Sequence, residues 1–176
     1  MTTTETLIFD LDGTISDPAQ GIRCSINYAL SHFGYPEVGA GAIAAYIGPP
    51  IDDSFRSITG SGGDAHVLEL VAKFRERYVE IGFSENELYP GVVDALLELR
   101  SRGHRLAVCT SKRVDIAEKI LAMFEIWHYF DFVSGGDVGI AKTDQLADVV
   151  SRERIGPYAM MIGDRSQDVR AALFNG

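Results

Sequence analysis

The chain has 176 residues, of which 46% are hydrophobic, so it can bury a sizeable core, and its length suits one domain with an insertion or two small domains. It carries 25 acidic against 16 basic side chains and a formal net charge of −9, which disfavours nucleic acid polymers and anionic membranes as partners. The only apolar run near the N-terminus, Leu7-Ile8-Phe9, is too short for a signal segment or a membrane span. We therefore expect a cytoplasmic protein.

Short apolar runs alternate with helical patterns over most of the chain. Four of these runs are typical of buried strands, at residues 6–9, 106–109, 130–133 and 159–162. Apolar residues recur at helical spacing over 92–102, a segment closed by Gly103, and again over 114–124. The alternation predicts an α/β fold with a doubly wound parallel sheet and helices on both of its faces. Ligands of such folds bind beyond the carboxyl ends of the strands.

Residues 17–87 interrupt this alternation, because they contain helical periodicity and no convincing strand. Asp17-Pro18 is a typical helix start, with an N-cap residue followed by proline in the first turn. Two apolar stripes at helical spacing follow, one at Ile22, Ile26, Leu30 and Phe33 and the other at Val67, Val71, Phe74, Tyr78 and Ile81. Such stripes are typical of the facing sides of a small bundle. We expect 17–87 to be an inserted helical subdomain that moves as a lid, and 1–16 with 88–176 to form the α/β core.

Two aspartates follow the first predicted strand, in the segment Phe9-Asp10-Leu11-Asp12-Gly13-Thr14. Asp10 and Asp12 are two residues apart at a strand end, so both carboxylates can project toward one point before Gly13 lets the backbone turn away. Taken alone, the pair is explained equally well as a solvated turn. The residues that follow the other predicted strands are needed to distinguish a functional acidic pair from a solvated turn.

Hydroxyl residues and lysines follow the next two strands. In Cys109-Thr110-Ser111-Lys112 a strand stops and a helix begins, and the free N–H groups there suit a phosphate oxygen, although a serine N-cap alone explains the pattern too. Lys142 lies after the third strand, just before a helix that we expect to begin near Thr143. By itself it is one lysine among many surface residues.

A second acidic pair follows the last predicted strand, in Gly163-Asp164-Arg165-Ser166-Gln167-Asp168. Asp164 and Asp168 are four residues apart, so they can lie on one face of a first helical turn, a place that also suits acidic residues for structural reasons. Two acidic pairs at strand ends would repel each other unless a cation neutralised them, and carboxylate oxygens beside a phosphate favour Mg²⁺. The 4 histidines are scattered without ligand spacing, which argues against zinc.

Together these segments resemble the motifs of the haloacid dehalogenase (HAD) superfamily of phosphatases, in the family's order: DLDGT at 10–14, Thr110-Ser111, Lys142 and GDRSQD at 163–168. The similarity spans nearly the whole chain. The helical insert after the first motif is similar to the cap of phosphoglycolate phosphatase-like members. IGPP at 47–50 with Ser54-Phe55, and ELYPG at 87–91, are similar to the branch of phosphoglycolate phosphatases and 5′-nucleotidases.

The resemblance implies a Mg²⁺-dependent phosphatase that acts on a small phosphorylated metabolite such as phosphoglycolate, a nucleoside monophosphate or a sugar phosphate. It implies that Asp10 attacks phosphorus to form an aspartyl-phosphate, while Asp12 protonates the leaving oxygen and later activates water. Mg²⁺ would be held by the Asp10 side chain, the Asp12 carbonyl and Asp164, with Asp168 a ligand or one water away.

The same resemblance assigns the phosphate contacts. Thr110 and the Ser111 amide would hold the phosphoryl oxygens, and Lys142 would neutralise charge on the phosphoryl group and the nucleophile. Gly13 belongs to the same phosphate-binding set. Arg56, in the helical insert, could meet a substrate anion, although a solvated helix position is the simpler explanation.

The chain departs from the family near its end, because members usually continue with another strand and helix after the fourth motif. One strand of the sheet would then be missing, and 159–162 would be an edge with exposed apolar surface. A phosphosugar mutase shares the same acids, and a phospho-receiver switch or a catalytically silent binding protein are alternatives from other classes. Release of free phosphate distinguishes a phosphatase from a mutase. We expect a monomer or a homodimer.

Overall fold

The computed structural model describes residues 5–60, 63–136 and 140–176. This part of the chain divides into two compact units, one formed by the described residues up to Ser16 together with Leu88–Gly176, and the other by Asp17–Glu87. Where the chain passes between the units, the short strands β2 (Ser16–Asp17) and β3 (Glu87–Leu88) pair with each other. The segment that leaves the first unit therefore returns beside its point of departure.

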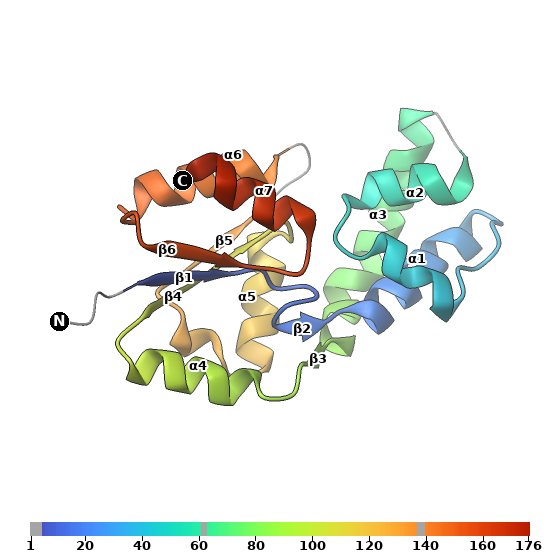
Figure 1. Cartoon of the computed structure of the whole chain (residues 1–176). Coiled ribbons are helices and arrows are strands. Elements are labelled where there is room, and N and C mark those ends of the chain that lie inside the picture. The colour runs from blue at the N-terminus through green and yellow to red at the C-terminus, as the bar shows by residue number, and fades with distance from the viewer. Residues whose placement is uncertain (1–4, 61–62, 137–139) are drawn as a thin grey trace. The chain divides into compact units, whose positions relative to one another are not determined.

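The first unit is built on a parallel sheet in the order β5-β4-β1-β6 (Figure 1). Its strands are β1 (Thr6–Phe9), β4 (Arg105–Thr110), β5 (Phe132–Gly135) and β6 (Ala159–Ile162). Phe9 of β1 is in register with Val108 of β4 on one side and Ile162 of β6 on the other. The parallel sheet confirms the predicted α/β fold.

Helices cover both faces of this sheet (Figure 1). One face carries α4 (Val92–Ser101) and α5 (Val114–Met123), and the other carries α6 (Lys142–Arg152) and α7 (Ser166–Asn175). On the α6 and α7 side, the core is formed by Ile8, Ala107, Cys109, Leu146, Val149 and Ala171. Strand β1 and most of β4 are buried between these helices, so their sequences are nearly continuous apolar runs.

The third strand begins two residues later than the sequence predicts, at Phe132 instead of 130. A short 3₁₀ helix, η3 (Trp127–Tyr129), precedes Phe130. Phe130 is buried before the ladder starts, because its ring packs edge-on against Phe9 with 6.3 Å between the ring centroids. An apolar run predicts which residues are buried, and here the first buried residue precedes the first residue that pairs with the neighbouring strand.

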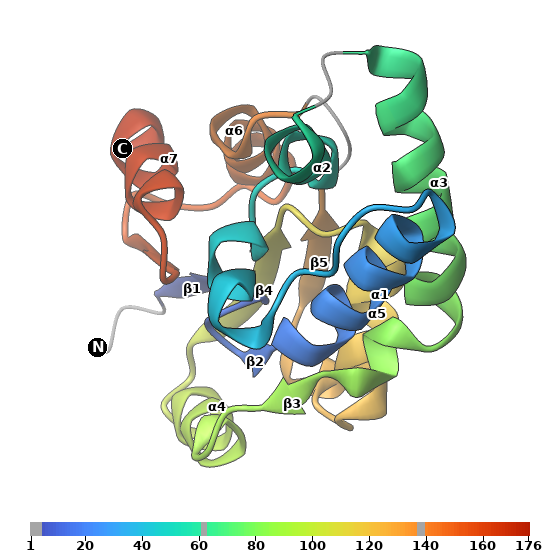
Figure 2. The same cartoon turned by 90° about the vertical axis from the view of Figure 1, so that its right-hand side faces the viewer.

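The second unit consists mainly of helices, and in Figure 2 α1 and α3 lie side by side. Its helices are α1 (Ala19–His32), η1 (Ala40–Tyr46), α2 (Ile51–Thr59), α3 (Asp64–Glu80) and η2 (Gly82–Glu85). The two predicted stripes supply buried side chains, among them Ile26 and Leu30 from α1 and Val67 and Val71 from α3, whereas Ile81 is 48% exposed. None of the described helices in either unit is long and apolar enough to cross a membrane.

Strand β6 lies at one edge of the four-stranded sheet. Large apolar side chains near this edge are exposed, with Met160 at 57%, Leu173 at 79% and Phe174 at 75%. An edge strand presents backbone groups that have no partner strand. The apolar surface that the sequence predicts for residues 159–162 is therefore present, and it extends to α7.

Candidate active site

The carboxyl ends of β1, β4 and β6 lie next to one another, because Phe9 is in register with both Val108 and Ile162. Asp10 directly follows β1, and its N–H donates to the Ile162 carbonyl at 2.8 Å. The topology thus brings motifs to one edge of the sheet although they are as many as 150 residues apart in the chain, as Thr14 and Asp164 are.

Asp10 is buried and is held through its Oδ1 atom. The Leu11 N–H donates to Oδ1 at 2.8 Å, and Lys142 Nζ forms an ion pair with the same oxygen at 3.1 Å. Burial raises the pKa of the Asp10 carboxyl above its ordinary value of 3.8, a shift that Lys142 opposes and the negative charge of Asp168 reinforces. With Oδ1 held from two sides, Oδ2 is the oxygen left to meet a ligand.

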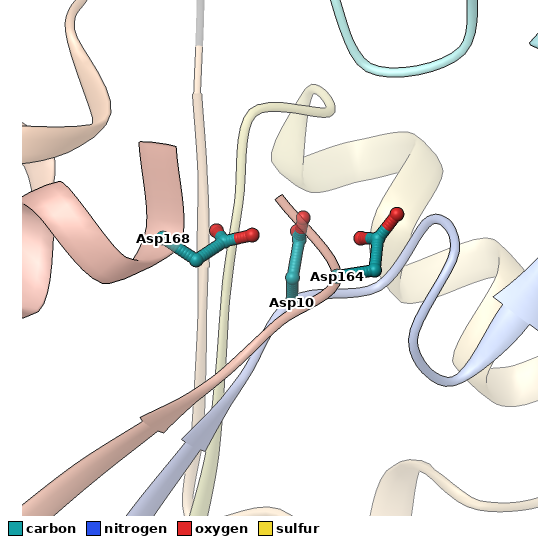
Figure 3. Close-up of side chains that lie close together, drawn as sticks. All are labelled: Asp10, Asp164 and Asp168. Carbon is teal, nitrogen blue, oxygen red and sulfur yellow. The ribbon is translucent and has the colours of Figure 1, made fainter. Parts of the chain in front are cut away.

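Asp10, Asp164 and Asp168 form an acidic cluster, in which one carboxylate oxygen from each residue lies within 4.8 Å of the others. In the view of Figure 3 the Asp10 carboxylate stands between those of Asp168, from α7, and Asp164, from the loop after β6. Lys142 also forms an ion pair with Asp168, and its side chain is only 4% exposed. The structure therefore brings together four of the predicted site residues.

Backbone groups and one hydroxyl surround the two aspartates that follow β6. The Arg165 N–H donates to Asp168 Oδ2 at 3.0 Å, at the start of α7. Gly13 has φ +81°, and a Cβ there would collide with the Asp164 carboxylate. The Thr14 hydroxyl lies 3.4 Å from Asp164 Oδ1. Glycine is needed at 13 both for the left-handed turn and for the approach of Asp164.

The side chain of Asp12 pairs with a lysine instead of joining the acidic cluster. Its Oδ2 lies 3.0 Å from Lys112 Nζ, and the two side chains are 13% and 9% exposed. Its Oδ1 is buried and has no hydrogen-bond partner among the described residues. The family resemblance implies that Asp12 binds the metal through its backbone carbonyl, which leaves the side chain for proton transfer, and this assignment stays a prediction.

Thr110 is buried at the end of β4, and Ser111 after it is exposed. Gln145, itself 7% exposed, reaches this strand end from α6. Its Nε2 donates to the Thr110 carbonyl at 3.0 Å and to the Ser134 carbonyl at 3.1 Å. One buried amide thus ties the ends of β4 and β5 to the first turn of α6, which also carries Lys142.

The sequence prediction gave no role to Lys112 or Gln145. Lys112 stands next to the Thr110-Ser111 motif at a predicted strand end, so its position was a signal for function that could have been used. Gln145 gave no comparable signal, because a glutamine three residues after Lys142 is an ordinary helix residue until its partners are known.

Arg56 belongs to the second unit, on α2, where its Nη2 forms an ion pair with Asp64 Oδ1 at 2.8 Å. It is not among the residues that the first unit brings together at its strand ends. A substrate contact by Arg56 stays a prediction.

The charges at these strand ends suit a divalent cation. Four carboxylates stand against two ammonium groups, which leaves two negative charges unbalanced: Asp10, Asp12, Asp164 and Asp168 against Lys112 and Lys142. One divalent cation would balance them, and carboxylate oxygens are ligands that Mg²⁺ prefers. The residues present therefore fit the predicted ion.

A family model described as "Haloacid dehalogenase-like hydrolase" matches residues 7–176. The chain is 40% identical to a tyrosine-protein kinase, PtkA, of Mycobacterium tuberculosis, over 97% of its own length but only 59% of the length of that relative. It is 33% identical to a 5′-nucleotidase of Pseudomonas aeruginosa, over 97% of this chain and 78% of the other.

Among solved structures, the chain is similar to one described as "a predicted phosphatase from Clostridium acetobutylicum", with a TM-score of 0.90 and 31% identity. That match covers 98% of this chain and 81% of the other. The family match extends over nearly the whole chain and includes all four motifs at the strand ends. The chain therefore belongs to the haloacid dehalogenase-like hydrolase family.

Proposed function

We propose that the protein is a Mg²⁺-dependent phosphatase that hydrolyses a small phosphomonoester through an aspartyl-phosphate on Asp10. The observation that carries this proposal is the surroundings of Asp10, a buried carboxylate at a strand end whose Oδ1 is held by Leu11 and Lys142. A nucleophile needs a fixed orientation, and this anchoring supplies it. The 5′-nucleotidase relative and the structural neighbour described as a phosphatase support the same class of reaction.

In the first half of the reaction, a carboxylate oxygen of Asp10 attacks phosphorus, and the bond between phosphorus and the ester oxygen breaks. Asp12 gives a proton to the departing alcohol. In the second half, Asp12 takes a proton from a water molecule whose oxygen attacks the aspartyl-phosphate, which releases inorganic phosphate and regenerates Asp10. The buried Asp12 Oδ1, which has no hydrogen-bond partner among the described residues, suits such an exchange of protons.

Positive charge and hydrogen-bond donors would stabilise the phosphoryl group as it passes to Asp10. Lys142 contacts the nucleophile directly, so it would offset charge on both groups. Thr110, the Ser111 amide and the turn at Gly13 would contact phosphoryl oxygens. Arg56 is the proposed contact from the second unit.

Asp10, Asp164 and Asp168 would hold the ion, together with the Asp12 carbonyl oxygen. Bound Mg²⁺ supplies positive charge that draws the phosphate dianion toward four acidic side chains. The proposed substrate is a small phosphorylated metabolite, such as phosphoglycolate, a nucleoside monophosphate or a sugar phosphate, and the protein would work in the cytoplasm as a monomer or homodimer.

The mycobacterial relative favours a second candidate, the transfer of a phosphoryl group from a nucleoside triphosphate to a tyrosine. This chain spans 59% of the length of that relative, so this candidate rests on the matched part of the relative alone. Incubation with ATP labelled in the γ-phosphate, followed by a search for labelled tyrosine in the protein, tests this candidate directly.

The main test measures phosphate release from p-nitrophenyl phosphate and from a panel of small phosphomonoesters, with Mg²⁺ and with EDTA. We expect Mg²⁺-dependent release in the native protein and loss of essentially all turnover in Asp10→Asn, because the variant lacks the attacking carboxylate. Asp94→Asn, at an exposed position on α4 of the same unit, is the matched control. Substantial turnover by Asp10→Asn would rule out the covalent route, and conversion of a sugar phosphate without release of phosphate would favour a mutase.

A further inference from the structure

Lys112 is a second lysine near the strand ends, and a backbone hydrogen bond holds its main chain. It lies two residues beyond Thr110, and the Gly136 N–H donates to its carbonyl at 2.9 Å, which links the chain after β4 to the chain after β5. Its Nζ lies 3.0 Å from Asp12 Oδ2, and its side chain is 9% exposed. The positive charge is therefore held at one place in the site.

The two lysines contact different members of the proposed machinery. Lys142 pairs with Asp10 and Asp168, on the side of the nucleophile and the acidic cluster. Lys112 pairs with Asp12, the proposed acid. The charge of Lys142 would thus lie near the phosphoryl group. The charge of Lys112 would lie near the leaving alcohol.

We propose that Lys112 is a specificity-determining residue that favours phosphomonoesters whose alcohol part carries an anionic group close to the ester oxygen. The inference rests on the proposed function, in which Asp12 donates to that oxygen. An acid in that role must come within about 3 Å of the ester oxygen, so Lys112 Nζ would lie within roughly 6–8 Å of it. At such a separation in a largely buried site, a unit charge distinguishes anionic, neutral and cationic leaving groups.

A series of two-carbon substrates isolates this charge effect, because their leaving groups have nearly the same size. Phosphoglycolate carries a carboxylate, hydroxyethyl phosphate a neutral hydroxyl and phosphoethanolamine an ammonium group. We expect the native protein to have a kcat/KM for phosphoglycolate about 10- to 100-fold above that for hydroxyethyl phosphate, with phosphoethanolamine slowest.

Substitutions of Lys112 then test whether its charge sets this order. Lys112→Gln should bring the three kcat/KM values to within about threefold of one another, and Lys112→Glu should place phosphoethanolamine first, because the sign of the charge is reversed. Lys112→Arg, which keeps the charge, should keep the native order. So should Lys119→Gln, which removes an exposed lysine from α5 of the same unit. Thermal melting identifies any variant that does not fold.

The outcomes separate selection by charge from a purely structural role. Equal losses for all three substrates in Lys112→Gln would show that Lys112 only positions Asp12, and this would overturn the inference. Turnover of p-nitrophenyl phosphate without any preference in the charge series would overturn the inference and leave the proposed function intact. Failure to hydrolyse any phosphomonoester, p-nitrophenyl phosphate included, would contradict both the inference about Lys112 and the proposed function.

Discussion

The ion pair at the nucleophile in the first unit differs in exposure from the ion pair of Arg56 in the second unit. In the first unit, the pair of Lys142 with Asp10 is buried, with side chains only 4% and 6% exposed. In the second unit, Arg56 and Asp64 form a pair of similar length with side chains 38% and 84% exposed. Exposed pairs contribute little to stability, whereas burying charges requires a large desolvation free energy that the pair itself often fails to recover. The first unit therefore holds a pair of charges whose burial is unfavourable for stability, and charges of this kind are typical of functional sites.

Among the tests of this difference between buried and exposed ion pairs, Lys142→Met should have the largest effect on turnover. Turnover of p-nitrophenyl phosphate should fall roughly 10²- to 10³-fold, because the variant lacks the group that stabilises charge on the nucleophile and the phosphoryl group. It also leaves Asp10 and Asp168 without their lysine, so circular dichroism must first establish the folded fraction. Lys119→Met should retain native turnover. A loss smaller than about tenfold per folded molecule would place Lys142 among the structural ion pairs.

The next effect is the stabilisation of the fold by Mg²⁺ bound at the acidic cluster. Mg²⁺ at about 100 times its Kd should add roughly 2.7 kcal/mol to the free energy of unfolding, which corresponds to a rise in Tm of about 5–10 °C. Asp164→Asn should abolish most of this rise and Asp94→Asn should preserve it, as differential scanning fluorimetry can measure. An equal rise in both variants would locate the binding of Mg²⁺ elsewhere.

A smaller effect should appear in the stability of Asp10→Asn in EDTA. Because the folded-state pKa of Asp10 is raised mainly by burial, folding favours the neutral carboxyl. The ionised form therefore begins to destabilise the fold as the pH rises above 3.8 and does so fully once the pH exceeds the folded-state pKa. Asparagine cannot ionise, so the variant should melt a few degrees higher than the native protein at neutral pH.

The control for this experiment is the pH dependence itself. The stability gain of Asp10→Asn should shrink as the pH falls toward 3.8, and the exposed variant Asp94→Asn should show no such trend. A gain that does not depend on pH would mean that packing, and not the ionised carboxylate, accounts for the difference.

The smallest effect is expected in the second unit. Asp64→Asn removes the exposed partner of Arg56 and should change the free energy of unfolding by less than about 1 kcal/mol in a urea titration. Phosphatase turnover should stay within about twofold of the native value, because an exposed ion pair contributes little to the position of either of its side chains. A large loss of turnover would show that Arg56 must be held by Asp64, and would support its proposed contact with substrate.

Much of the fold could be predicted because short apolar runs in the sequence indicate strands of the sheet. Strands β1 and β6 occupy the predicted residues, and both end where charged or glycine residues, Asp10 and Gly163, replace the apolar run. Strand β5 was misplaced because the apolar Phe130 is buried by an aromatic contact instead of by strand pairing.

The candidate site could be predicted in part for a similar reason. The spacing of Asp164 and Asp168 places both at one strand end, and parallel strands bring their carboxyl ends together, so a cluster with Asp10 followed. The pair of Lys112 with Asp12 could not be predicted, because it depends on the direction of two side chains from the segments after β1 and β4. The bridge made by Gln145 depends in the same way on the separation of β4, β5 and α6.

The pairing of β2 with β3 has a consequence for protein engineering. Paired strands run about 4.8 Å apart, so the two ends of the segment Asp17–Glu87 are neighbours. A segment with adjacent ends can be replaced by a foreign helical module, or by a short turn, without rerouting the strands of the parallel sheet. The segment can therefore be exchanged at this junction. Chimeras that carry different inserted modules on the same parallel sheet can then be screened for new substrates.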